Sequence, residues 1–129
     1  MSNSDFDAGM KMRRRLLGND YVDRAEAVKT EFDTRFQQYI TESAWGAVWS
    51  DPTIDLRTRS LLTIALLAAL GHEKELALHL RATKHTGVGV EEVREALMHV
   101  AVYAGVPAAN RAFAVAKKSL AESEALDGD

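Results

Sequence analysis

The residues best suited to chemistry lie between residues 72 and 87, where imidazole and carboxylate groups recur at helical spacing. In a helix that ends at Gly87, His79 follows Glu75 by one turn, so the two side chains point the same way. His72 lies close to the same stripe if the helix starts early enough. Burial and a neighbouring charge set the protonation of such a pair, and we predict acid–base catalysis. The alternative is an ordinary i,i+4 pair that stabilises a helix by roughly a few tenths of a kcal/mol.

Metal binding is a second possible use of the same segment, because His72, Glu75 and His79 are spaced so that three ligands could share one face. The spacing matches neither the His-Glu-x-x-His zinc helix nor the Glu-x-x-His pair of di-iron bundles, and we expect no bound metal. The chain has no cysteine, which excludes thiol nucleophiles, disulfides and zinc–thiolate sites. It also lacks a serine elbow, a glycine-rich phosphate loop and a dinucleotide fingerprint. What remains is acid–base chemistry without a cofactor.

Helices must position these residues, because no segment shows the sustained alternation of a strand. The spacing of apolar residues predicts an all-α protein, a compact bundle of about six to seven helices. The expected helices cover residues 5–17, 21–31, 33–44, 55–70, 72–87, 90–104 and 107–120. We expect a single domain over residues 1–129, with residues 1–6 and 122–129 frayed.

Two residues outside this segment are further candidates for the site. Arg59 lies where the polar start of helix 55–70 meets its apolar run, which suits an arginine that binds a carboxylate. An ordinary surface arginine is the alternative. Tyr103 lies one turn after His99, and its hydroxyl needs a partner if it is buried. His99 itself is expected to be an ordinary buried histidine.

Composition limits the partners and the compartment. The 129 residues carry a formal net charge of -3, so no basic bias favours nucleic acid or an anionic membrane. The most apolar run, residues 61–70, is shorter than the about 20 residues that a membrane span needs. The polar, acidic N-terminus does not resemble a signal peptide. We expect a cytoplasmic protein with a small-molecule partner. Apolar residues on more than one side of helix 90–104 also predict a homo-oligomer.

Several short motifs extend over nearly the whole chain, from about residue 9 to residue 120. They are Gly-Met-Lys-Met-Arg-Arg at 9–14, Val-Asp-Arg-Ala at 22–25, Ala-Trp-Gly at 44–46, Arg-Ser-Leu-Leu-Thr-Ile-Ala at 59–65, Glu-Leu-Ala-Leu-His-Leu-Arg-Ala at 75–82 and Val-Tyr-Ala-Gly-Val-Pro-Ala-Ala-Asn at 102–110. Together they resemble the carboxymuconolactone decarboxylase family, within the larger superfamily of alkyl hydroperoxidase D-like proteins. The resemblance implies the orthogonal helical fold of that superfamily.

The resemblance also implies an activity, the cofactor-free decarboxylation of 4-carboxymuconolactone to 4-oxoadipate enol-lactone in protocatechuate catabolism, the β-ketoadipate pathway. His79 and Glu75 would then be catalytic, Arg59 would hold the carboxylate that stays, and Tyr103 and His72 would bind the substrate. The family further suggests a ring-shaped oligomer, a hexamer. The alternative is a non-catalytic, oligomeric small-molecule-binding member of the same superfamily.

The sequence departs from the peroxidase branch of the superfamily, in which a Cys-x-x-Cys-x-x-x-His motif carries redox chemistry. Here His72 and Glu75 occupy the two cysteine positions, while His79 matches the histidine. Thiol peroxidase activity is therefore excluded. His85 and His99 stand where we expect amide side chains in the decarboxylases, so substrate preference could differ if these positions touch the substrate.

Overall fold

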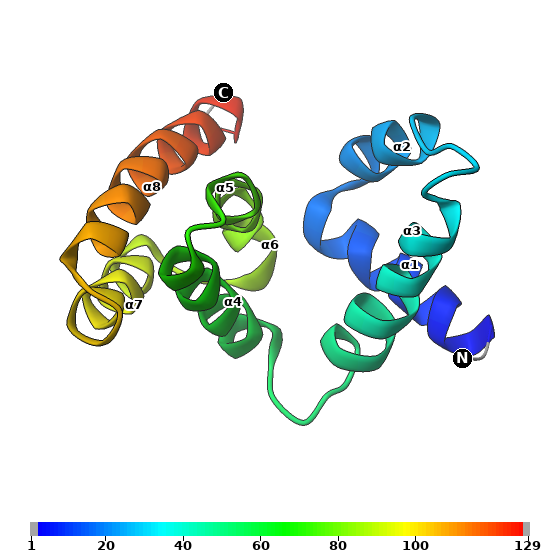
Figure 1. Ribbon diagram of the computed structural model, residues 1–129, viewed down its shortest axis with the longest axis horizontal. Helices are drawn as coiled ribbons and strands as arrows, with labels where there is room; N and C mark the ends of the chain where they lie inside the picture. Colours follow the sequence, from blue (N-terminus) through cyan, green and yellow to red (C-terminus); the bar gives the residue numbers. More distant parts are fainter. Residues whose placement is uncertain (1–2, 128–129) are drawn as a thin grey trace. The chain divides into compact units, whose positions relative to one another are not determined.

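The computed structural model describes residues 3–127, and every regular element within that range is a helix (Figure 1). The elements are α1 (Asn3–Leu17), α2 (Asn19–Ala27), α3 (Thr34–Ile40), the π-helix η1 (Thr41–Trp49), α4 (Leu56–Leu70), α5 (Glu73–Arg81), α6 (Thr83–Thr86), α7 (Val90–Tyr103) and α8 (Val106–Asp127). The all-α prediction is confirmed. Among the described residues, no helix is long and apolar enough to cross a membrane.

Contacts divide the chain into two compact units, Met1–Asp55 and Leu56–Asp129, and each is described by itself. The predicted single domain stays a prediction. The backbone of residues 3–6 and 122–127 is helical where fraying was expected. Ser119 and Ser123 are both buried, because the end of α8 packs on one face instead of standing free. The outermost residues of the predicted frayed ends, 1–2 and 128–129, lie outside the described residues.

The first unit is held together by the packing of α1 on η1. Thr41, Trp45 and Trp49 follow one another at four-residue intervals along η1, and all three are buried. The two indole rings stack with centroids 5.4 Å apart. Aromatic side chains of this size supply much of the apolar area that a unit of this length can bury.

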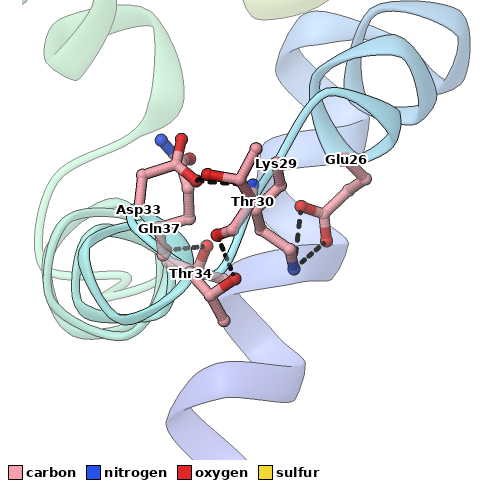
Figure 2. Close-up of polar contacts among 7 residues, drawn as sticks. Glu26, Lys29, Thr30, Asp33, Thr34 and Gln37 are labelled. Carbon is pink, nitrogen blue, oxygen red and sulfur yellow. Dashed lines mark hydrogen bonds and ion pairs between the residues drawn. The ribbon is translucent and has the colours of Figure 1, made fainter.

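Figure 2 shows the connection between α2 and α3, which short polar contacts fix in place. Lys29 Nζ lies 3.3 Å from Glu26 Oε2. The backbone N–H of Thr30 donates to Asp33 Oδ1 at 2.8 Å, and the Thr34 hydroxyl donates to the Thr30 carbonyl oxygen at 2.7 Å. Side chains that bind nearby backbone groups in this way stabilise turns rather than continuous helix.

Gly9 and Gly46 allow the backbones of α1 and η1 to approach each other closely. A Cβ atom on Gly9 would collide with the carbonyl oxygen of Thr41, and one on Gly46 would collide with that of Asp5. We expect Gly46→Ala to lower the free energy of unfolding by about 1–3 kcal/mol, as overpacking in a core typically does. Urea unfolding measures this change. Ala47→Ser, which adds one atom at an exposed position of η1, is the control. Equal stability of the two variants would contradict the proposed close packing.

The second unit has an apolar core in which α4 packs against α5, α7 and α8. Its buried side chains come from all four of these helices and the loop before α7: Ile64, Ala68, Leu76, Leu80, Val88, Val93, Leu97, Val100, Ala108, Ala109, Ala112 and Ala116. The alanines of α8 present little side-chain bulk, so neighbouring backbones can come close. This core fixes α4 and α5, the two helices that carry most of the predicted site.

An ion pair ties the first turn of α4 to the first turn of α7. Glu92 Oε1 accepts from the Gly89 N–H at 3.0 Å and from Arg57 Nε at 3.2 Å, and Glu92 Oε2 contacts Arg57 Nη2. Glu92 therefore caps α7 and binds Arg57 with both carboxylate oxygens. A bidentate pair of this kind fixes orientation better than a single contact does.

Candidate active site

The segment that carries the predicted pair is broken into two helices, so the prediction of one continuous helix over 72–87 is wrong. α5 ends at Arg81, and α6 begins at Thr83. The Thr83 hydroxyl donates to the Leu80 carbonyl oxygen at 2.6 Å. A threonine that binds the backbone in this way competes with regular helical geometry. As predicted, the segment stops at Gly87, whose φ of 81° is left-handed and whose N–H donates to the Thr83 carbonyl oxygen.

α5 places the two members of the pair in different surroundings. His79 is only 9% exposed, whereas Glu75 lies in the exposed first turn of the helix. His72 is the residue just before α5 and is also exposed, and its carbonyl oxygen accepts from the Leu76 N–H at 2.9 Å. The imidazole is thus an interior group, with a carboxylate one turn away at the surface.

This arrangement determines the charge of His79. Burial lowers its pKa from 6.5 to about 4, and the negative charge of Glu75 partly opposes that change. His79 is therefore a neutral imidazole at pH 7. A neutral imidazole donates one hydrogen bond and accepts another, so it can polarise a carbonyl group or accept a proton. Very little of the side chain is in the protonated, imidazolium form near neutral pH, so it is poorly suited to general-acid catalysis there.

The other predicted site residues also belong to the second unit, but they differ in exposure. Arg59 is half-buried in the first turn of α4, the helix that packs against α5. Tyr103 is the last residue of α7 and is 80% exposed. Its ring lies 5.2 Å from that of His99, measured between centroids. His99 is exposed, so the prediction of a buried histidine there is wrong. The roles proposed for Arg59, His72 and Tyr103 stay predictions.

Buried hydroxyl groups near the break between α5 and α6 are a feature that the sequence did not reveal. Ser60 of α4 and Thr86 of α6 are both buried, and their Oγ atoms lie 3.1 Å apart. Thr86 follows His79 by two helical turns, so its place on the buried side could have been read from the spacing. Nothing in the sequence pairs it with a serine 26 positions earlier.

Among the described residues of the second unit, hollows on the surface include two that are lined by neither His79 nor Glu75. One, of about 570 Å³, is lined by Leu61 together with Glu91, Glu95 and His99 of α7, among others. The other, of about 410 Å³, is an apolar groove between α7 and α8. Across the part of the chain that the structure describes, no three histidine, aspartate or glutamate side chains gather closely enough to hold a metal ion.

Glu75→Gln tests the coupling within the pair. Because the Glu75 carboxylate raises the pKa of His79, its removal is expected to lower that pKa below about 4. The chemical shifts of the His79 ring, followed by NMR as the pH is lowered, measure the change. Glu73→Gln is the matched control, since Glu73 is an exposed glutamate of the same first turn. An unchanged His79 titration in Glu75→Gln would refute the coupling.

Taken together, the fold and the site define a class: an all-α protein whose candidate site combines a buried neutral imidazole with a nearby carboxylate and no thiol. The model of the carboxymuconolactone decarboxylase family matches residues 34–118. The match begins at α3 and extends into α8. The chain belongs to the carboxymuconolactone decarboxylase family, as the sequence motifs predicted.

Two individual relatives are similar over more of the chain than the family model covers. It is 42% identical to the 4-carboxymuconolactone decarboxylase of Acinetobacter baylyi over 113 residues, which cover 88% of this chain and 84% of that protein. It is 43% identical to the nitrosuccinic acid decarboxylase of Metarhizium robertsii over 115 residues, which cover 89% of this chain and 80% of that protein. A 41-residue match to the 4-carboxymuconolactone decarboxylase of Pseudomonas putida is 44% identical. Coverage of this extent must include α2, so the similarity also reaches into the first unit.

Proposed function

We propose that this protein is a cofactor-free carboxy-lyase that converts 4-carboxymuconolactone to 4-oxoadipate enol-lactone. The observation that carries the proposal is a buried, neutral His79 beside a carboxylate in a chain without cysteine. The similarity to the Acinetobacter baylyi decarboxylase over 84% of that protein supports the choice of substrate.

The chemistry requires little of the protein beyond orientation and electrostatic stabilisation. When the ring carboxylate leaves as CO2, its electron pair moves through the ring double bond to the lactone carbonyl oxygen. The neutral imidazole of His79 donates an N–H hydrogen bond to that oxygen as charge develops, which is the function of an oxyanion hole. Arg59 holds the carboxylate that remains, since a guanidinium group binds carboxylates through two parallel hydrogen bonds. A proton taken up from the solvent then adds to a ring carbon and gives the enol-lactone.

A second candidate substrate is nitrosuccinic acid, because the relative named for that substrate is as similar to this chain as the lactone decarboxylase is. The two compounds make the same demands on a site. Each has a carboxylate that leaves from a carbon conjugated with, or attached to, an electron-accepting group. Each also keeps a second carboxylate, and in each the negative charge develops on oxygen. The same imidazole and the same arginine therefore serve either reaction.

The two candidates are separated by measuring kcat/KM of the wild-type protein for both compounds. Evolution of CO2 reports either reaction, and loss of the ultraviolet absorbance of the lactone reports the first. We expect turnover of the lactone with the higher kcat/KM. A higher value for nitrosuccinic acid would transfer the assignment to that substrate. Absence of CO2 from both would leave the non-catalytic binding protein as the function.

We also propose that the protein is a cytoplasmic homo-oligomer, a hexamer, that binds neither nucleic acid nor membranes. The support is an apolar stripe on α4, where Leu62, Leu66 and Leu70 are each more than half exposed. An exposed stripe of leucines at four-residue intervals is typical of a helix that another surface covers. Sedimentation equilibrium distinguishes a hexamer from a 14.2 kDa monomer.

A further inference from the structure

A row of buried side chains runs along α5 and α6 and changes in character along its length. It begins with Leu76, continues through His79 and Leu80, and ends with Thr83 and Thr86. Residues at these spacings share one side of a helix. The row is therefore apolar where α5 begins and polar where α6 ends. A buried polar end is unfavourable unless its hydroxyl groups are hydrogen-bonded.

The hydroxyl groups of Thr83 and Thr86, at the polar end of this row, form different hydrogen bonds. The Thr83 hydroxyl bonds locally, to the Leu80 carbonyl oxygen at 2.6 Å. The Thr86 hydroxyl instead lies 3.1 Å from Ser60 Oγ, on a helix that begins 27 residues before α6. It lies farther, at 3.4 Å, from the Thr83 carbonyl oxygen. The Ser60–Thr86 pair thus links two helices, whereas the Thr83 bond stays within its own segment.

One end of this link adjoins a predicted site residue in the sequence, and the other lies on α6, the helix that follows the one carrying His79. Ser60 directly follows Arg59 in the first turns of α4, and its side chain is 1% exposed. Thr86 ends the segment that carries His79. A buried hydrogen bond fixes its two partners more tightly than apolar contact does, because apolar contacts have no preferred direction. This bond therefore helps to set how the start of α4, which carries Arg59, lies against the segment that contains α5 and α6.

We propose that Ser60 and Thr86 are positioning residues, which hold the arginine that binds the retained carboxylate at a fixed distance from the imidazole. This inference rests on the proposed decarboxylase function. Neither hydroxyl group needs to touch the substrate. Their effect passes through Arg59, so losing the bond should weaken substrate binding more than it slows the chemical step.

The test is a set of steady-state measurements on three variants. Thr86→Val keeps the shape of the side chain and removes the hydroxyl group, and we expect KM to rise about tenfold while kcat changes less than about threefold. Thr86→Ser retains the hydroxyl group and should restore most of the lost affinity. Thr63→Val is the control, because the Thr63 hydroxyl bonds to the Arg59 carbonyl oxygen within α4 at 2.8 Å and links no second helix. Its KM should stay within about twofold of the wild-type value.

A double-mutant cycle with Arg59→Ala separates positioning from a general loss of stability. If the hydroxyl pair acts through Arg59, Thr86→Val should raise KM no further once Arg59 is alanine. Additive effects of the two substitutions would overturn the inference, as would equal KM values for Thr86→Val and Thr63→Val. Ser60→Ala removes the other partner and serves if Thr86→Val does not fold.

A binding measurement keeps this test independent of turnover. The saturated lactone, which lacks the ring double bond, has no conjugated electron acceptor and cannot lose CO2 by this route. Calorimetric titration with this compound should give a dissociation constant that rises in Thr86→Val and not in Thr63→Val. If the wild-type protein binds this compound but releases no CO2 from the lactone, the proposed function fails while the positioning inference is still tested.

Discussion

Replacing His79 by glutamine is expected to lower kcat for the lactone about 100- to 1,000-fold, which is the usual effect of removing one oxyanion-hole donor. The expected size follows from where the imidazole lies. His79 is 9% exposed and neutral at pH 7. A hydrogen bond in a buried environment of low dielectric constant stabilises a developing charge far more than a hydrogen bond in water does. KM should change little, because the bond becomes strong only as the charge develops.

Two further measurements test the role given to His79. Imidazole added to His79→Ala should restore part of the activity, because the substitution leaves a space of the right shape for it. The kcat of the wild-type protein should not fall as the pH rises through 6.5, because a pKa of about 4 means that the His79 side chain is already neutral below and above that pH. A decline there would mean that the imidazolium form is the active one. Wild-type activity of His79→Gln would remove His79 from the mechanism.

The second large effect is expected in stability at acid pH. Because burial lowers the pKa of His79 from 6.5 to about 4, the unfolded chain binds more protons than the folded chain between these two values. Stability therefore falls as the pH is lowered from 6.5 to 4, and the contribution of His79 to that fall ends below pH 4. Each unit of pKa change corresponds to 1.36 kcal/mol, so the full loss in the free energy of unfolding that His79 causes is roughly 3 kcal/mol.

Urea unfolding of the wild-type protein and of His79→Gln at pH 7.5 and pH 4.5 measures this contribution. Carboxylates also titrate in this range, so the quantity of interest is the difference between the two proteins. The wild-type protein should lose more stability than His79→Gln on acidification. His85→Gln is the matched control, because it removes an exposed histidine and should keep the wild-type pH dependence. Equal losses in the wild-type protein and His79→Gln would show that the His79 pKa does not change on folding.

Local sequence signals were sufficient to place most of the helices. Gly87 and Gly89 mark the end of one helical segment and the start of the next, and both boundaries lie where the spacing predicted them. The helix predicted over 21–31 ends earlier, at Ala27, and the one predicted over 33–44 continues as a π-helix to Trp49. A further exception is the break at Ala82, which separates α5 from α6. There, the helical spacing of the buried residues continues across the break, so periodicity alone cannot detect it. The Thr83 hydroxyl donates a hydrogen bond to the Leu80 carbonyl oxygen. This local interaction cannot be predicted from the pattern of apolar residues.

What the sequence determined by itself is which chemistry is possible. The absence of cysteine, the one-turn spacing of Glu75 and His79, and the family motifs follow from residue types and order, and no tertiary contact changes them. Only the tertiary structure decided which member of the pair is buried, because spacing puts two residues on one face without saying how far the neighbouring helices extend over it. It also decided the pairing of Ser60 with Thr86. That contact joins residues far apart in the chain, and only the packing of the core brings them within hydrogen-bond distance.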